Sequence, residues 1–97
     1  MHLRVTAAQM RPGKMQEGMT IMRELFAAYR QAGGFQKGYL AGDEQAGDAV
    51  AVTLWDSEEA AQAAVKQTTQ TLAKLAPLMA SGQAPVPPRA HPVLLES

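Results

Sequence analysis

The chain has 97 residues, of which 46% are apolar, and its nine basic side chains balance nine acidic ones. This length fits one small domain spanning residues 1–97, the zero formal charge gives no long-range field to attract nucleic acid, and the lack of cysteine excludes disulfides and thiolate metal sites. No apolar run approaches the roughly 20 residues that cross a bilayer, and the first ten residues lack the layout of a secretion signal, so we expect a cytoplasmic protein without membrane contact.

Residues 5–10, preceded by residues 2–4, are predicted as a first strand, which Arg11-Pro12-Gly13 ends because proline cannot donate to a central ladder. Apolar residues then recur at alternating steps of four and three, which predicts a helix over residues 14–32 with one apolar face. The residues of that face are Met15, Met19, Met22, Leu25, Phe26 and Tyr29. Gly33-Gly34 supplies the left-handed conformation that commonly ends a helix.

Two further strands are predicted over residues 35–41 and 49–55, joined into a hairpin by the polar, glycine-flanked turn at residues 42–48. We expect Phe35, Lys37 and Tyr39 to share one face of the second strand. The third strand directs Val50, Val52 and Leu54 to one face and Ala51, Thr53 and Trp55 to the other. Because neither set favours water, both faces of this strand are expected to be covered.

A second helix is predicted to begin after a cap at Asp56 or Ser57, where two glutamates complement the helix dipole, and to run to about Lys66. Residues 67–71 are poor helix formers and predict a bend. A leucine stripe then restores helical spacing, although Pro77 shortens it. Residues 81–91 are rich in proline and predict an extended connector to a short last strand over residues 92–96.

This order of elements predicts an α+β fold, the ferredoxin-like split βαβ with a four-stranded antiparallel sheet and helices on one face. The opposite face, marked by Val50, Val52 and Leu54, then needs another cover. Pairing with a second copy of the chain is the simplest solution, so we expect a homodimer through this sheet face.

Three local patterns occur in the order typical of one family: Arg11-Pro12-Gly13-Lys14, Gly33-Gly34-Phe35, and the stretch from Val52 through Trp55-Asp56-Ser57-Glu58-Glu59 to Ala60. Together they resemble the antibiotic biosynthesis monooxygenase-like (ABM) family. The resemblance implies two ferredoxin-like subunits that close into a dimeric α/β barrel, each with a cavity between sheet and helices. It also implies cofactor-independent oxidation of aromatic polyketides or quinols, haem degradation, or no known activity.

The haem-degrading branch of this family uses an asparagine in the first strand and a histidine on the helix after the tryptophan. This chain has Thr6 and, by ungapped counting, Val65 at those places. Neither side chain ligates iron as imidazole does, and the two histidines, His2 and His91, have no ligand spacing. We therefore expect no haem degradation, no metal site and no cofactor.

The resemblance places Trp55 at the border of the cavity, where its ring could stack on a planar substrate; the alternative is core packing at the end of a strand. Tyr29 could donate a phenolic hydrogen bond, although its place on the apolar stripe also fits a core residue. The methionine stripe fits a ligand groove or plain core filling. The candidate pocket residues are Trp55, Thr6, Tyr29, Phe26 and Met22, with no catalytic residue identified.

Three functions follow from this reading of the chain. The first is a monooxygenase in which a small aromatic substrate is deprotonated and passes electrons to dioxygen directly, with the protein supplying orientation and electrostatics. Its difficulty is the missing general base, since no histidine or carboxylate pair is placed to activate the substrate. The alternatives are a non-catalytic module that binds a small ligand and a dimeric scaffold whose cavity is filled by its own methionines.

Overall fold

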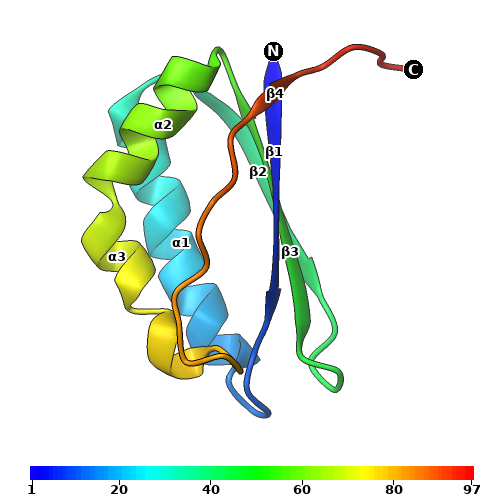
Figure 1. The fold of residues 1–97 in the computed structure, drawn as a ribbon, viewed down its shortest axis with the longest axis vertical. Coiled ribbons are helices and arrows are strands. Elements are labelled where there is room, and N and C mark those ends of the chain that lie inside the picture. Colours follow the sequence, from blue (N-terminus) through cyan, green and yellow to red (C-terminus); the bar gives the residue numbers. More distant parts are fainter.

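Helices cover one face of an antiparallel sheet in the computed structural model, which describes residues 1–97 (Figure 1). In chain order the elements are β1 (His2–Gln9), α1 (Met15–Ala32), β2 (Phe35–Gly42), β3 (Asp48–Trp55), α2 (Glu58–Gln67), α3 (Thr69–Ala73), the 3-10 turn η1 (Ala76–Leu78) and β4 (His91–Pro92). The sheet has the order β2-β3-β1-β4, and all three pairings are antiparallel. This order is that of the split βαβ and confirms the predicted fold class.

The junction between α1 and β2 depends on two glycines with positive φ. Gly33 (φ 88°) follows the last residue of α1, as the sequence predicts, and Gly34 (φ 77°) leads into β2. A Cβ atom on Gly34 would lie 2.5 Å from the Cβ of Ala60, so the close approach of α2 to this junction requires glycine. The predicted helix of residues 14–32 is thereby confirmed to within one residue.

The second helical segment is capped and broken where the sequence predicts. The Ser57 hydroxyl accepts a hydrogen bond from the Ala60 N–H at 3.1 Å and forms the N-cap of α2. At Thr68 the chain bends between α2 and α3, and the Thr68 hydroxyl donates to the carbonyl of Ala64 at 2.8 Å. Pro77 lies in η1, which follows α3 and ends the helical layer.

A β-bulge near the start of β2 corrects one prediction. Phe35 pairs with Trp55 and Lys37 pairs with Leu54, so the extra residue between Phe35 and Lys37 reverses the alternation of side chains. Phe35 therefore faces the helices, while Lys37 and Tyr39 lie on the opposite face. The prediction that these three side chains share a face was wrong, because alternation counted from the sequence does not register an inserted residue.

The last strand is also shorter than predicted. Only His91 and Pro92 pair with β1, and the Val93 N–H donates to the Met1 carbonyl at 3.0 Å. Because β4 runs antiparallel to β1 and pairs with its first residues, the chain after Val93 extends past the end of that strand. Leu94 and Leu95 are 93% and 90% exposed, so the predicted strand over residues 92–96 is corrected to residues 91–92.

The sheet face away from the helices is apolar and uncovered. Val52 of β3 lies opposite Val5 of β1 and Tyr39 of β2. Val5 is 47% exposed and Tyr39 is 50% exposed, although both are large and largely apolar. The predicted alternation of β3 is thus confirmed, and its valines lie on a face that no helix of the same chain covers.

Candidate functional site

A cavity with a volume of about 60 Å³ lies between the sheet and the helices. Fourteen of its 20 lining residues are hydrophobic, and five of the six methionines of the chain are among them. These methionines are Met10, Met15, Met19, Met22 and Met79. Pro85 and Pro87, from the segment between η1 and β4 that runs beside β1 (Figure 1), also line it. The cavity is therefore an apolar chamber with flexible walls.

Short side chains on the sheet leave this space open. Apart from Arg4, the helix-facing positions of β1 and β3 that line the cavity carry short side chains, namely Thr6, Ala8, Ala49, Ala51 and Thr53. Longer side chains at these positions would fill the gap beneath α1. On the helix itself, a Cβ atom on Gly18 would lie 2.6 Å from the Cε of Met10, so glycine there lets the Met10 side chain reach across. The cavity thus follows from small residues on the sheet and long, flexible ones around it.

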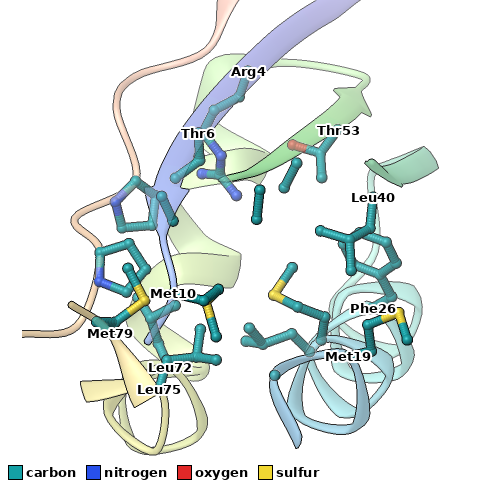
Figure 2. A pocket seen from close by; sticks show the side chains of 18 of the residues that line it. Arg4, Thr6, Met10, Met19, Phe26, Leu40, Thr53, Leu72, Leu75 and Met79 are labelled. Carbon is teal, nitrogen blue, oxygen red and sulfur yellow. The ribbon is translucent and has the colours of Figure 1, made fainter. Parts of the chain in front are cut away.

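One end of the cavity is polar. Arg4 of β1 pairs with Thr53 of β3, and Figure 2 shows Arg4, Thr6 and Thr53 at the same end of the chamber. Arg4 is only 4% exposed. Its Nη1 donates to the Ala61 carbonyl at 3.4 Å, a long hydrogen bond. Arg4 is the only charged residue in the lining.

The guanidinium of Arg4 packs against aromatic rings rather than against a carboxylate. Its Cζ lies 5.2 Å from the ring centroid of Trp55 and 5.8 Å from that of Tyr29. The three ion pairs of the structure lie elsewhere, at Lys14–Glu17, Lys74–Glu24 and Arg89–Glu58. Cation–π contact compensates part of the cost of burying the charge, but no anion of the chain neutralises it.

Burial shifts the pKa values of both groups at this end. It lowers the pKa of Arg4, and the neighbouring Tyr29 opposes that change. Burial also raises the pKa of Tyr29, against the opposing effects of Arg4 and of Thr68. Because an arginine stays protonated in proteins and the tyrosine is held neutral, both side chains are hydrogen-bond donors at neutral pH.

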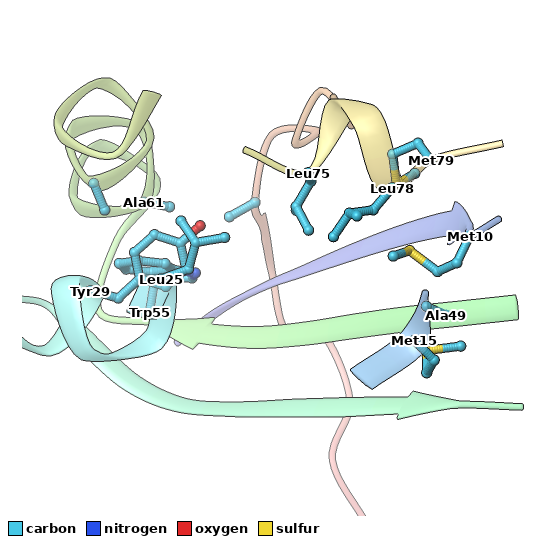
Figure 3. Close-up of a cluster of buried hydrophobic side chains, with 12 residues drawn as sticks. Met10, Met15, Leu25, Tyr29, Ala49, Trp55, Ala61, Leu75, Leu78 and Met79 are labelled. Atoms are coloured by element: carbon cyan, nitrogen blue, oxygen red, sulfur yellow. The ribbon is translucent and has the colours of Figure 1, made fainter. Parts of the chain in front are cut away.

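Of the candidate residues from the sequence, Thr6, Met22, Phe26 and Tyr29 are brought together in the cavity lining, and Trp55 is not among the lining residues. Trp55 is 0% exposed. In Figure 3 it lies with Leu25 and Tyr29 beside Ala61 of α2. It stands behind Arg4 and Tyr29 as packing support.

The position of Trp55 is fixed from two sides. Its Nε1 donates to the Thr53 hydroxyl at 2.9 Å. Its ring meets those of Tyr29 and Phe35 edge-on, with centroids 5.1 Å apart in each case. The tryptophan therefore orients both the Thr53 hydroxyl and the ring of Tyr29 at the polar end of the cavity.

Arg4 is the residue that sequence reasoning missed. The pairing of β1 puts Arg4 on the helix-facing side with Thr6 and Ala8, and Val5 on the exposed side. The sequence signal is that Arg4, a charged residue, alternates along β1 with the same period as Thr6 and Ala8, which face the helices. It becomes visible only once the inward face of β1 is known.

The remaining polar candidates lie outside the cavity. Tyr39 is on the uncovered sheet face, and His91 is exposed at the sheet edge. His2 pairs with Trp55 and Pro92, and its Nδ1 is buried without a hydrogen-bond partner. No group of three or more histidine, cysteine, aspartate or glutamate residues could hold a metal ion, and none of the helices is long and apolar enough to span a membrane.

No protein-family model matches the chain, and no curated protein matches it. Several solved structures do match the chain. A proposed antibiotic biosynthesis monooxygenase from Chloroflexus aurantiacus J-10-fl is 19% identical with a TM-score of 0.72, covering 99% of this chain and 96% of that chain. Another from Nitrosomonas europaea is 13% identical with a TM-score of 0.77, covering 98% of this chain and 100% of that chain.

A third solved structure is a mutant of MhuD with two manganese protoporphyrin IX molecules bound per active site. It is 22% identical with a TM-score of 0.64, covering 100% of this chain and 98% of that chain. At these identities the likeness concerns the fold. The chain has the ferredoxin-like fold of structures named as antibiotic biosynthesis monooxygenases, in agreement with the resemblance found in its sequence.

Proposed function

We propose that the chain is a cofactor-independent monooxygenase that binds a small aromatic substrate, of quinol or polyketide type, in the cavity beneath α1. The observation that carries the proposal is an apolar chamber with hydrogen-bond donors at one end, in a fold shared with proteins named as monooxygenases. Such a chamber excludes water from a hydrophobic ring and orients its oxygen atoms.

The reaction needs no oxidant besides dioxygen. An activated ring methylene, that of an anthrone or of the keto tautomer of a quinol, becomes a carbonyl: one oxygen atom of dioxygen stays in the product and the other leaves as water with the two methylene hydrogens. The substrate supplies all four electrons. The protein's part is to hold the ring and to stabilise negative charge on the substrate oxygen, which Arg4, Thr53 and Tyr29 are placed to do as donors.

The size of the cavity favours a small substrate. A free volume of about 60 Å³ is well below the roughly 300 Å³ at the lower end of ligand pockets, so a ring enters only if the walls move. Met19 and Met22 supply flexible walls on the helix side. Haem is not part of the proposal, because Thr6 and Val65 stand where the haem-degrading branch has asparagine and histidine.

A second candidate is a binding protein that uses the same cavity without catalysis. The observation in its favour is that no aspartate, glutamate, histidine or lysine lines the cavity, so no side chain there serves as a general base. Both functions are compatible with a homodimer through the sheet face of Val50, Val52 and Leu54, which we propose as the assembly because that face is apolar and uncovered.

The test is oxygen uptake with anthrone and with small quinols, and quinone formation followed by absorbance. Ala51→Leu fills the cavity and should abolish the enzyme-dependent rate, whereas Ala27→Leu, on the exposed side of α1, should keep it. Thermal melts establish that both variants are folded. Rates equal to buffer alone with every substrate would remove the catalytic proposal, and ligand retained in native mass spectrometry would then favour the binding protein.

A further inference from the structure

The buried guanidinium of Arg4 has no counter-ion within the chain. It is 4% exposed, its hydrogen bonds go to neutral oxygens (the Ala61 carbonyl at 3.4 Å and the Tyr29 hydroxyl), and the three ion pairs of the structure involve other residues. A buried charge without a partner lowers stability, and proteins generally pair such a charge or use it. The guanidinium lines the cavity, so a ligand there can reach it.

The polar groups around Arg4 are also ready to donate. The Thr53 hydroxyl already accepts from Trp55 Nε1 at 2.9 Å, which leaves its proton free to donate. Tyr29 carries its phenolic proton at neutral pH because the ordinary pKa of tyrosine is 10.0, and burial raises that pKa further. No acidic side chain lines the cavity. The group that satisfies three such donors is an acceptor with negative charge.

The geometry of the guanidinium adds a preference for a planar oxyanion. It packs against both Trp55 and Tyr29, with its Cζ 5.2 and 5.8 Å from their ring centroids, and the two rings themselves meet edge-on, so it is oriented before any ligand arrives. A planar fork of N–H donors matches a carboxylate or an ionised hydroxyl on a ring better than a point charge does.

We propose that Arg4 binds the anionic oxygen of an aromatic ligand, a ring carboxylate or an ionised phenol or enol, whose apolar body occupies the methionine-lined part of the cavity. This inference deepens the proposed function, since it names the charge class of the substrate. It also explains how the substrate could be activated although no general base lines the cavity. A phenol or enol that has given its proton to bulk water before it enters is held as the anion beside Arg4, because the cation stabilises that form.

The test uses pairs of anionic and neutral compounds of similar shape. Benzoate is compared with benzamide by calorimetry, and 4-nitrophenolate with 4-nitroanisole by absorbance, against the wild type, Arg4→Met, Arg4→Lys and the control Arg23→Met. Arg23 is an exposed residue of α1. We expect the wild type and Arg23→Met to favour each anion at least tenfold. Arg4→Met should lose that preference and keep its affinity for the neutral compounds, with Arg4→Lys in between.

Equal binding of anion and neutral partner by the wild type, or no binding of either anion at millimolar concentration, overturns the proposal. So does an anion preference that survives in a folded Arg4→Met. Thermal melts check the fold: removing an unpaired buried charge should leave stability unchanged or raise it. Benzoate is not oxidised under these conditions, so its binding is measured independently of catalysis. An anion preference without oxygen uptake from anthrone or quinols refutes only the proposed enzyme activity. Oxygen uptake from anthrone or quinols without an anion preference refutes only this inference.

Discussion

Arg4 and Thr53 face each other across β1 and β3, and the hydroxyl of Thr53 is held by the indole of Trp55. Two residues that line the polar end of the cavity are thus tied to a tryptophan that does not line it. Through this chain of contacts, substitutions at Trp55 change the site indirectly. Trp55→Ala would remove a fully buried side chain, so loss of activity in that variant would reflect loss of fold.

Thr53→Val should destabilise the protein by about 1–3 kcal/mol, because it keeps the shape of the side chain but leaves the Trp55 N–H buried without an acceptor. Thr53→Ser retains the hydroxyl and is the matched control. Urea unfolding measures both. A Thr53→Val variant as stable as the wild type would mean that Trp55 finds another partner.

The protein should lose stability in alkali through Tyr29. The pKa of Tyr29 is raised in the folded state above its ordinary value of 10.0, chiefly by burial. The folded state therefore holds the phenolic proton more tightly than the unfolded state, so the stabilisation is complete below about pH 10 and is lost as the pH rises through the folded-state pKa. Melts from pH 8 to 11 should fall more steeply for wild type than for Tyr29→Phe. The same slope in both would contradict the assignment, and Tyr39→Phe, on the exposed face, serves as control.

Deleting Gln36 should be tolerated. The residue occupies the bulge between Phe35 and Lys37, so its removal leaves Phe35 opposite Trp55 and Lys37 opposite Leu54 in a regular ladder. The variant loses the hydrogen bond from Gln36 to Asp56 at the surface, a cost of about 1 kcal/mol. Deleting Leu40 instead would turn Lys37 toward the buried face and should prevent folding. Circular dichroism and melting distinguish the two, and an unfolded Gln36 deletion would show that the bulge itself is required.

Val52→Lys should convert the proposed homodimer into a monomer, because it places a charge in the middle of the uncovered sheet face. Ala27→Lys, on the exposed side of α1, is the control and should remain dimeric. Light scattering after size exclusion gives the masses. A wild type that is monomeric at micromolar concentration would remove the dimer altogether.

The sequence predicted the secondary structure correctly where the apolar residues of a segment follow one regular spacing. The four-and-three spacing of α1 and the cap at Ser57 each fix a local structure with short-range contacts alone. Phe35 was misplaced because a bulge is set by the pairing partner and not by the strand's own residues. Trp55 was placed at the border of the cavity by the family resemblance, and only the packing of Tyr29 and Phe35 around it shows that the ring is enclosed.

Arg4 shows the same limit at the site. A charged residue beside exposed Val5 gives no sign of its depth until the register of β1 against β3 is known. Met22, Phe26 and Tyr29 could be named in advance because they lie on the apolar face of α1, and Thr6 because the family resemblance points to its position. The only charged group of the cavity belongs to Arg4, and the sequence alone did not show which face of β1 that residue occupies.

The methionine lining carries a consequence for how long such a catalyst would last. Five thioethers surround the space in which dioxygen would meet the substrate, and each can take up one oxygen atom to become a sulfoxide. Hydrogen peroxide released by an incomplete reaction would pass one oxygen atom to a wall thioether and leave as water before it reached the solvent. Each sulfoxide would make the cavity wall more polar. The mass of the protein would therefore rise by one oxygen atom for each reaction that released peroxide into the cavity.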